Sequence, residues 1–415
     1  MLEKSTTCSE AASRRAPADA PDGWRAWVMV GAAFVVGFVV FGVTYSFGVF
    51  FKPIAAEFGA GRAATSAFFS ITGLIFYLLG SVTGHVSDRF GPRLIVGVGA
   101  ATMGVGLVLT AFIGKVWVGY LTYGIGVGVG SACVYVPTLA IIGGWFVRRR
   151  NTALGIAAAG TGCGTLLMPP LAAWMIERYG WRATDLVLGM ACAALLAGCA
   201  IVVRPPPLGS AGAKRSLAGV VRSRAFIMLY ASWVLATTAL FVPFVFLPAF
   251  AVSHGASDVA ASALLSLLGG MGILGRVGIG ALSERVGMLR LFKGSVLIMA
   301  ASYLIWLTVS AYHWQVVFAI LLGLGYGIRI SLMPAVLIEF FGLPNLGAIL
   351  GIFFTASGIS ASLGPLLAGW IVDATDSYRW GIVFALATAT LGLLAILPLR
   401  VDDAREARRA RRLMV

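Results

Sequence analysis

Two arginines, Arg276 and Arg329, each lie well inside a long apolar stretch of the sequence. A guanidinium group offers parallel N–H donors that match the two oxygens of a carboxylate, so anion binding is the chemistry such residues can do. A positive charge in apolar surroundings costs at least about 2.5 kcal/mol and needs a partner or a water-filled cavity. Both residues are therefore candidates for an anion site. Arg276 could instead extend to the nearer end of its helix, and Arg329 could act as a structural clamp.

Three tyrosines are candidates for further contacts to the same anion. Tyr326 precedes Arg329 by three residues, so the two share a helical face. Tyr135 lies two residues before Pro137, where its hydroxyl could donate to a carboxylate or to a backbone carbonyl freed by the proline. Tyr45, in the first apolar stretch, is the third candidate.

The acidic residues avoid the middle of every apolar stretch. They lie in the terminal segments, in charged loops or at the ends of apolar stretches, and Asp185 is one of those at the ends. The sequence therefore offers no acid in the middle of a stretch that could carry a proton.

Metal, nucleotide and cofactor sites are not expected. His85, His254 and His313 are scattered at the ends of apolar stretches, which does not suit a metal site. The alternate glycines between positions 124 and 130 resemble a nucleotide-binding fingerprint, but no strand precedes them and close helix packing explains them better. Because no nucleotide-binding domain follows, ATP is not expected as the energy source.

The elements that position these residues are transmembrane helices. Only 11% of the 415 residues are charged, whereas a soluble domain carries charge on about 25%, and the mean hydropathy is +0.94. A helix needs about 20 apolar residues to span a bilayer. The charged and turn-forming clusters divide the chain into twelve such spans, at about residues 26–51, 64–84, 94–114, 117–146, 152–176, 184–203, 225–252, 259–282, 294–311, 315–341, 347–372 and 380–399. We therefore expect an all-α membrane protein, which excludes a secreted disulfide scaffold and a cytosolic enzyme.

The distribution of positive charge predicts how the chain is oriented. If both termini are cytoplasmic, 23 Lys and Arg residues face the cytoplasm and 6 face the opposite side. The positive-inside rule then predicts a multi-pass protein of the cell (inner) membrane with both termini cytoplasmic. The same asymmetry accounts for the net charge of +15 without nucleic acid as a partner.

The two halves of the chain repeat each other at a shift of 196 positions. A loop pattern of glycines and paired charges occurs in both, as Gly84-x-x-x-Asp88-Arg89-x-Gly91 and Gly280-x-x-x-Glu284-Arg285-x-Gly287. We expect Asp88 with Arg89, and Glu284 with Arg285, to belong to gating ion pairs on the cytoplasmic side.

This repeat predicts two pseudo-symmetric six-helix bundles. Repeats of this kind are typical of transporters that rock around a binding site near the bilayer midplane. We expect an N-terminal tail over residues 1–25, bundles over 26–203 and 225–399, a cytoplasmic linker over 204–224, and a C-terminal tail over 400–415.

Three sequence motifs resemble those of known transporters. The segment 84–93, GHVSDRFGPR, resembles the loop signature of the major facilitator superfamily between its second and third helices. The segments 145–150, WFVRRR, and 155–160, GIAAAG, are similar to the fifth-helix motif of the monocarboxylate transporter family (solute carrier family 16) and its bacterial relatives. That family's first-helix motif resembles the segment 22–27, DGWRAW, displaced by one residue.

The resemblance implies a proton-coupled carrier of a small monocarboxylate, such as lactate or pyruvate, in which Arg276 binds the substrate carboxylate. Two positions depart from the family pattern. Its proton-coupled mammalian members look to have a Lys at Tyr45, and an Asp at Gly272, one helical turn before Arg276. Because that acid is missing, the proton would travel on the substrate itself or on His254 or Asp258, in the loop after the seventh span.

Two other functions are compatible with the sequence. An exchanger of the oxalate:formate antiporter type could grip two carboxylates with Arg276 and Arg329. That family pairs its eighth-helix Arg with a Lys in the eleventh helix, and residues 347–372 contain no Lys. A membrane sensor could bind the same anion without carrying it. An enzyme is least expected, because the sequence shows no nucleophile, metal or cofactor constellation.

Overall fold

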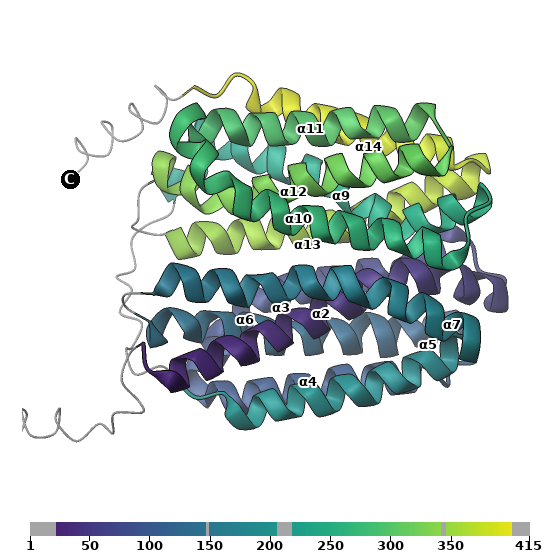
Figure 1. Ribbon diagram of the computed structural model, residues 1–415, viewed down its shortest axis with the longest axis horizontal. Coiled ribbons are helices and arrows are strands. Elements are labelled where there is room, and N and C mark those ends of the chain that lie inside the picture. Colours follow the sequence, from purple (N-terminus) through teal and green to yellow (C-terminus); the bar gives the residue numbers. More distant parts are fainter. Residues whose placement is uncertain (1–21, 147–148, 206–217, 342–345, 401–415) are drawn as a thin grey trace, which may run out of the picture.

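The computed structural model describes residues 22–146, 149–205, 218–341 and 346–400, and the regular elements in these ranges are helices. The N-terminal bundle consists of α2 (Trp24–Phe58), α3 (Arg62–Phe90), α4 (Pro92–Thr110), α5 (Val116–Gly119), η2 (Tyr120–Val127), α6 (Gly128–Trp145) and α7 (Arg150–Val202). The C-terminal bundle consists of α9 (Arg224–Ser253), α10 (Asp258–Val286), α11 (Met288–Thr308), α12 (Tyr312–Phe341), α13 (Leu346–Thr375) and α14 (Tyr378–Ile396), preceded by the short α8 (Ala218–Val221). Figure 1 shows the two bundles lying against each other, with the axes of their long helices roughly aligned.

The described helices cross the membrane twelve times. Eleven of them are long and apolar enough to span it, and one, within α7, has 50 residues. Gly180 interrupts α7 with φ 78° and ψ 161°. Glycine adopts a positive φ at little cost, so the chain turns at this residue and α7 provides two spans. The prediction of an all-α, twelve-span membrane protein is therefore confirmed.

The fourth span differs from the continuous helix expected over residues 117–146. It begins as α5, continues as the π-helix η2 and ends as α6. A Cβ atom added to Gly126 would lie 3.0 Å from the Gly106 Cα, and one added to Gly130 would lie 2.5 Å from the Met103 Cβ. The glycines of this span therefore let α4 approach closely, in agreement with the helix-packing interpretation.

Small residues also bring the two bundles together. The bundles meet mainly where α3 packs on α13 and α7 packs on α10. A Cβ atom on Gly73 would lie 2.7 Å from that of Ala361, and a Cβ atom on Gly269 would lie 2.7 Å from Thr165 Cγ2. Side chains larger than hydrogen at these glycines would push the bundles apart.

One end of the molecule is closed by contacts between the bundles. We call this end, which holds Arg62 and Asp373, the outer end, after the orientation that the cations predict, and the opposite end the inner end. The Asp373 carboxylate of α13 accepts the backbone N–H groups of Arg62 and Ala63 at the start of α3, each at 2.8 Å. Arg62 Nη1 lies 3.3 Å from Asp376 Oδ1, and its guanidinium carbon lies 5.1 Å from the centre of the Tyr378 ring. The N-terminus of a helix in one bundle is thus capped by the other bundle.

Candidate functional site

Arg276 lies in α10 with its side chain half-buried between the two bundles. Its Nη1 donates to Thr161 Oγ1 of α7 at 2.9 Å, and its Nη2 donates to the Tyr326 hydroxyl of α12 at 3.4 Å. Its guanidinium carbon lies 5.6 Å from the centre of the Tyr326 ring. Arg276 therefore connects the C-terminal bundle, which carries it, to the N-terminal bundle.

The positive charge of Arg276 has no counter-ion among the residues that the structure describes. Its buried Nε also has no hydrogen-bond partner within this set. An arginine stays protonated at physiological pH, and its bonds to an anion are stronger than those to neutral hydroxyls. The arrangement can therefore accept a carboxylate.

Four tyrosines form a connected group, and two of them, Tyr326 and Tyr135, interact with the Arg276 guanidinium. The hydroxyl of Tyr45 interacts with those of Tyr77 and Tyr326. Tyr135 interacts electrostatically with Arg276 and with Tyr326. The three tyrosines chosen from the sequence thus belong to one group, which reaches Arg276 through Tyr326 and Tyr135, and their role in binding stays a prediction.

Tyr77 is the member of this group that the sequence analysis missed. It interacts with Tyr45, Tyr135 and Tyr326. A signal was present, because Tyr77 follows Gly73 by four residues and therefore shares the helical face on which Gly73 contacts α13.

A small cavity beside these tyrosines has aromatic walls. Its volume is about 10 Å³, and it is lined by Val40, Phe41, Thr44, Tyr45, Phe69, Gly73, Phe76, Tyr77, Phe241 and Ala361. The Tyr45 ring stacks on Phe244 with centroids 4.1 Å apart, and Phe41 contacts Tyr135 edge-on at 5.0 Å. A space of this size holds about one water molecule, so these side chains leave no room for a substrate among them.

The surroundings of Tyr135 and Gly272 bear on two points of the sequence analysis. Tyr135 makes no hydrogen bond to a backbone carbonyl among those found in the described residues, although Pro137 lies nearby. A Cβ atom on Gly272 would lie 3.4 Å from Tyr326 Cδ1. The Tyr326 ring therefore borders the position at which the family's acid would stand.

Arg329 is buried inside the C-terminal bundle, where its side chain is 1% exposed. Its Nη2 donates to the Trp233 carbonyl at 3.0 Å and to Thr237 Oγ1 at 2.6 Å, and its guanidinium carbon lies 4.1 Å from the centre of the Trp233 ring. These partners belong to α9 of the same bundle. Arg329 also interacts electrostatically with Tyr326, whose hydroxyl accepts a hydrogen bond from Arg276.

His254 and Asp258 lie at the outer end, between α9 and α10, and both are exposed. The Nδ1 of His254 lies 2.8 Å from the Phe250 carbonyl oxygen. Asp258 is in the first turn of α10, eighteen residues before Arg276, which is about 27 Å of helix rise. The structure does not bring these two residues together with Arg276, and their role in proton coupling stays a prediction.

The predicted gating residues lie at the inner end and are only partly visible. The side chains of Asp88, Glu284 and Arg285 are outside the described residues. Arg89 is exposed, with its guanidinium carbon 5.5 Å from the centre of the Phe90 ring. The gating ion pairs stay a prediction, and most of the predicted linker, residues 206–217, also lies outside the described residues.

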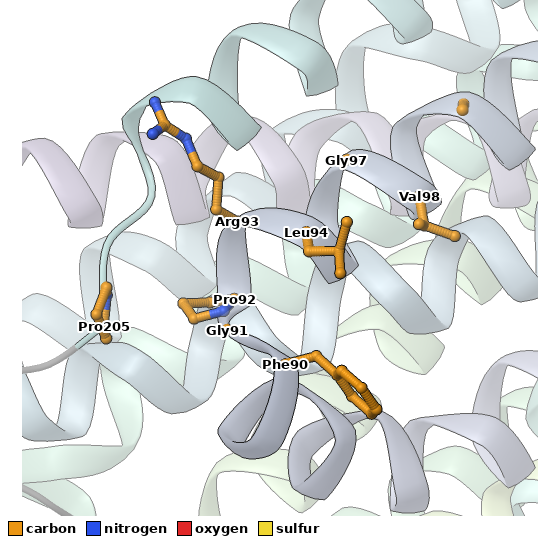
Figure 2. Close-up of a pocket in the computed structure, with 9 residues that line it drawn as sticks. Phe90, Gly91, Pro92, Arg93, Leu94, Gly97, Val98 and Pro205 are labelled. Atoms are coloured by element: carbon orange, nitrogen blue, oxygen red, sulfur yellow. The ribbon is translucent and has the colours of Figure 1, made fainter.

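A wide hollow of about 670 Å³ lies elsewhere, at the inner end of α4 (Figure 2). Its lining is apolar, with Phe90 and Leu94 on one side and Pro205 on another. Arg93 is the one charged residue among the described residues that line it, and its Nη2 donates to the Ile201 carbonyl at 2.6 Å. The hollow therefore offers little to orient an anion, and Arg276 marks the better candidate.

Comparisons with known sequences identify the family of the chain. The chain matches the Major Facilitator Superfamily over residues 33–361 and again over residues 290–413. Monocarboxylate transporter 3 of Rattus norvegicus is 32% identical over 402 residues, which cover 92% of this chain and 81% of the rat protein. Monocarboxylate transporter 13 of Bos taurus is 31% identical over 395 residues, which cover 92% of this chain and 91% of the bovine protein.

Solved structures with similar folds are transporters. A bacterial homolog of the human lysosomal transporter Spinster, in an inward-facing and unoccupied conformation, has a TM-score of 0.75 at 15% identity, covering 90% of this chain and 97% of that one. The nucleoside transporter NupG has a TM-score of 0.72 at 16% identity, covering 89% of this chain and 99% of that one. At this level of identity the likeness extends to the fold alone.

Proposed function

The chain belongs to the monocarboxylate transporter family of the major facilitator superfamily, and from this premise we propose that it carries a small monocarboxylate, of the lactate or pyruvate class, by alternating access. The observation that carries the proposal is the Arg276 guanidinium, which bridges the two bundles through Thr161 without a counter-ion in the described residues. A substrate carboxylate would take the place of the neutral hydroxyl and form a charge-assisted bond.

The surroundings of Arg276 favour one carboxylate over two. The small cavity at Tyr45 and Tyr77 is lined mainly by aromatic and aliphatic side chains, which suit an apolar substituent better than a second charge. Arg329 already donates to the Trp233 carbonyl and Thr237. The described helix α13 contains no Lys that could hold a second carboxylate. Exchange of dicarboxylates of the oxalate and formate type is therefore the weaker alternative.

During alternating access, the hydrogen bond between Arg276 and Thr161 would break and form again. Because the bond crosses from one bundle to the other, a separation of the bundles breaks it and frees the Nη1 donor for a substrate. The outer end is closed by the Asp373 contacts, and the cavity of about 10 Å³ is smaller than any carboxylate. Substrate would then enter and leave through states in which one end is open.

We further propose that a proton accompanies the anion and that the protein lies in the cell (inner) membrane with both termini cytoplasmic. The family resemblance supports the proton, and the excess of Lys and Arg on one side supports the orientation. The bundles would then span residues 26–203 and 225–399, joined by a cytoplasmic linker over 204–224.

Uptake into proteoliposomes tests the proposal. Labelled lactate, pyruvate, oxalate and malonate are offered with and without an acidic exterior, at clamped membrane potential. We expect lactate or pyruvate to accumulate under the pH gradient and the accumulation to disappear with a protonophore. Uptake of oxalate only into formate-loaded vesicles would instead identify an exchanger, and saturable binding without uptake would identify a sensor.

A further inference from the structure

Asp185 is a buried acid that the transport mechanism above does not use. From the sequence it belongs with the acids at the outer ends of the spans, but the structure places its side chain inside the N-terminal bundle, where it is 1% exposed. Its Oδ2 has no hydrogen-bond partner among the described residues. The residue follows the Gly180 turn by five positions, or about 7.5 Å of helix rise, so only a short path separates it from the outer end.

Two weakly acidic groups lie near this carboxyl group. Tyr123 of η2 and Cys192 of α7 both interact electrostatically with Asp185. Neither is a base, so neither neutralises an ionised carboxylate. The Tyr123 hydroxyl donates to the Val43 carbonyl of α2 at 3.4 Å.

The charged groups on the helices that neighbour Asp185 either bind other residues or lie far from its carboxyl group. In α4 the one titratable residue is Arg93, at the inner end. The titratable residues of α2 are Arg25, Tyr45, Lys52 and Glu57. Of these, Lys52 is exposed, and Glu57 Oε1 lies 2.6 Å from Arg182 Nη2, one turn further out on α7 than Asp185. Asp185 therefore has no ion-pair partner among the described residues.

These surroundings determine whether the Asp185 carboxyl group is protonated. An ionised carboxylate buried without a counter-ion costs many kcal/mol, so in the closed structure Asp185 is stable only with a proton. Tyr123, which interacts with Asp185, belongs to η2, a π-helix, and such irregular elements occur frequently at functional sites. Through Tyr123, η2 touches α2 at Val43, two residues from Tyr45, whose ring stacks on Phe244 of the other bundle. A chain of contacts through Tyr123, Val43 and Tyr45 therefore connects Asp185 with the contact between the bundles.

We propose that Asp185 is the binding site of the coupling proton, an inference that rests on the proposed proton-coupled transport. Its carboxylate takes up a proton when the outer end admits water, and the closed bundles hold the neutral acid while the anion is carried. Asp185 then performs the task for which the chain lacks an acid at Gly272, from the other bundle.

Transport measurements on Asp185→Asn test the coupling. The variant should keep exchange of lactate between the two sides of the vesicle and lose the accumulation driven by a pH gradient. Glu177→Gln, which changes an exposed acid shortly before the Gly180 turn, serves as the control and should accumulate lactate like the wild type. Gradient-driven accumulation by Asp185→Asn equal to that of the wild type overturns the proposal, as does its loss in Asp258→Asn alone.

Infrared difference spectroscopy of the purified protein gives a readout independent of transport. At neutral pH the wild type should show the carbonyl stretch of a protonated carboxyl group, and Asp185→Asn should lack it while Glu177→Gln retains it. Should the Asn variant fail to fold, Asp185→Leu removes the acid without a new polar group and is measured in the same way. An unchanged band in the variant overturns proton binding at Asp185. A band assigned to Asp185 without gradient-driven uptake in the wild type overturns the coupling role and the proposed symport instead.

Discussion

Arg276 and Arg329 both carry a charge without a counter-ion among the described residues, but their hydrogen bonds run in different directions. Arg276 is half-buried and donates to Thr161 in the opposite bundle. Arg329 is fully buried and donates to the Trp233 carbonyl and Thr237 in its own bundle. One arginine lies across the contact between the bundles, and the other lies within one bundle, which would move as a unit in the proposed alternating access.

This difference separates two uses of a buried charge. A contact between the bundles is made and broken as they rock, so its partner can be exchanged for a substrate. A contact within one bundle persists through the cycle and suits the task of holding helices in place. Burial of the charge alone does not distinguish the two uses, whereas the position of its partners does.

Removal of the Arg276 side chain should have the largest effect. Arg276→Ala should abolish transport, because loss of one partner of a buried charge pair costs about 2–5 kcal/mol. Arg276→Lys should retain weak transport, because an ammonium group lacks the two-pronged geometry. Initial uptake rates per reconstituted protein measure both effects. Both variants should still be expressed. Uptake by Arg276→Ala at the wild-type rate would show that Arg276 does not bind the substrate.

The Lys substitution at Arg329 should lower the stability of the protein. Arg329→Lys loses the stacking on Trp233 and leaves acceptors without their donors, which costs about 1–3 kcal/mol of stability. We expect a lower temperature of thermal unfolding in detergent and an unchanged KM for transport by the folded protein, with the opposite pattern for Arg276→Lys. A raised KM at unchanged stability would show that Arg329 binds the substrate directly, as the sequence suggested.

Two tyrosines of the C-terminal bundle allow a finer comparison. Tyr326→Phe removes the hydroxyl that contacts Arg276 at the site and should weaken substrate affinity by about 0.5–1.5 kcal/mol. Tyr303→Phe removes a hydroxyl that donates to the Ala239 carbonyl at 2.7 Å within the bundle. The second variant should lose stability and keep its affinity. Equal losses of affinity in both variants would contradict the assignment of Tyr326, and not Tyr303, to the binding site.

The contacts at the outer end should give the smallest effects. Asp373→Ala removes the cap on α3 and should favour states open at the outer end, by about 0.5–2 kcal/mol. Asp376→Ala should change less, because its side chain is 92% exposed and an exposed ion pair contributes at most about 1 kcal/mol. Distances between spin labels at the outer ends of α3 and α13 measure the populations. Equal populations in Asp373→Ala and the wild type would show that the cap does not stabilise closure.

The span count and the position of Arg276 could be predicted from the sequence, because both depend on local composition. Twelve apolar stretches give twelve crossings, and an arginine within such a stretch must find a partner wherever the helices pack. The partners themselves could not be predicted. Whether Arg276 points to Thr161 and Arg329 to Trp233 depends on how each helix is rotated about its axis, which the uniform hydrophobicity of these spans does not encode.

Three further features depend on packing between helices. Tyr77 joins the site because Gly73, on the same face of α3, lets α13 approach. The π-helix η2 lies in an uncharged apolar run that continues into α6, so composition does not mark where the helix type changes. Asp185 lies close to a helix end in the sequence, yet the surrounding helices cover it. Position along a span therefore predicts depth in the membrane better than burial within the protein.

Binding of lactate to the purified protein tests the central claim most directly, because it separates recognition of the carboxylate from movement of the bundles. Calorimetric titration of the wild type, Arg276→Ala and Arg329→Lys is carried out with lactate and with lactamide, its uncharged amide. We predict that the wild type and Arg329→Lys bind lactate but not lactamide, and that Arg276→Ala binds neither. Binding of lactate by Arg276→Ala with the Kd of the wild type would contradict the assignment of Arg276 as the residue that holds the anion.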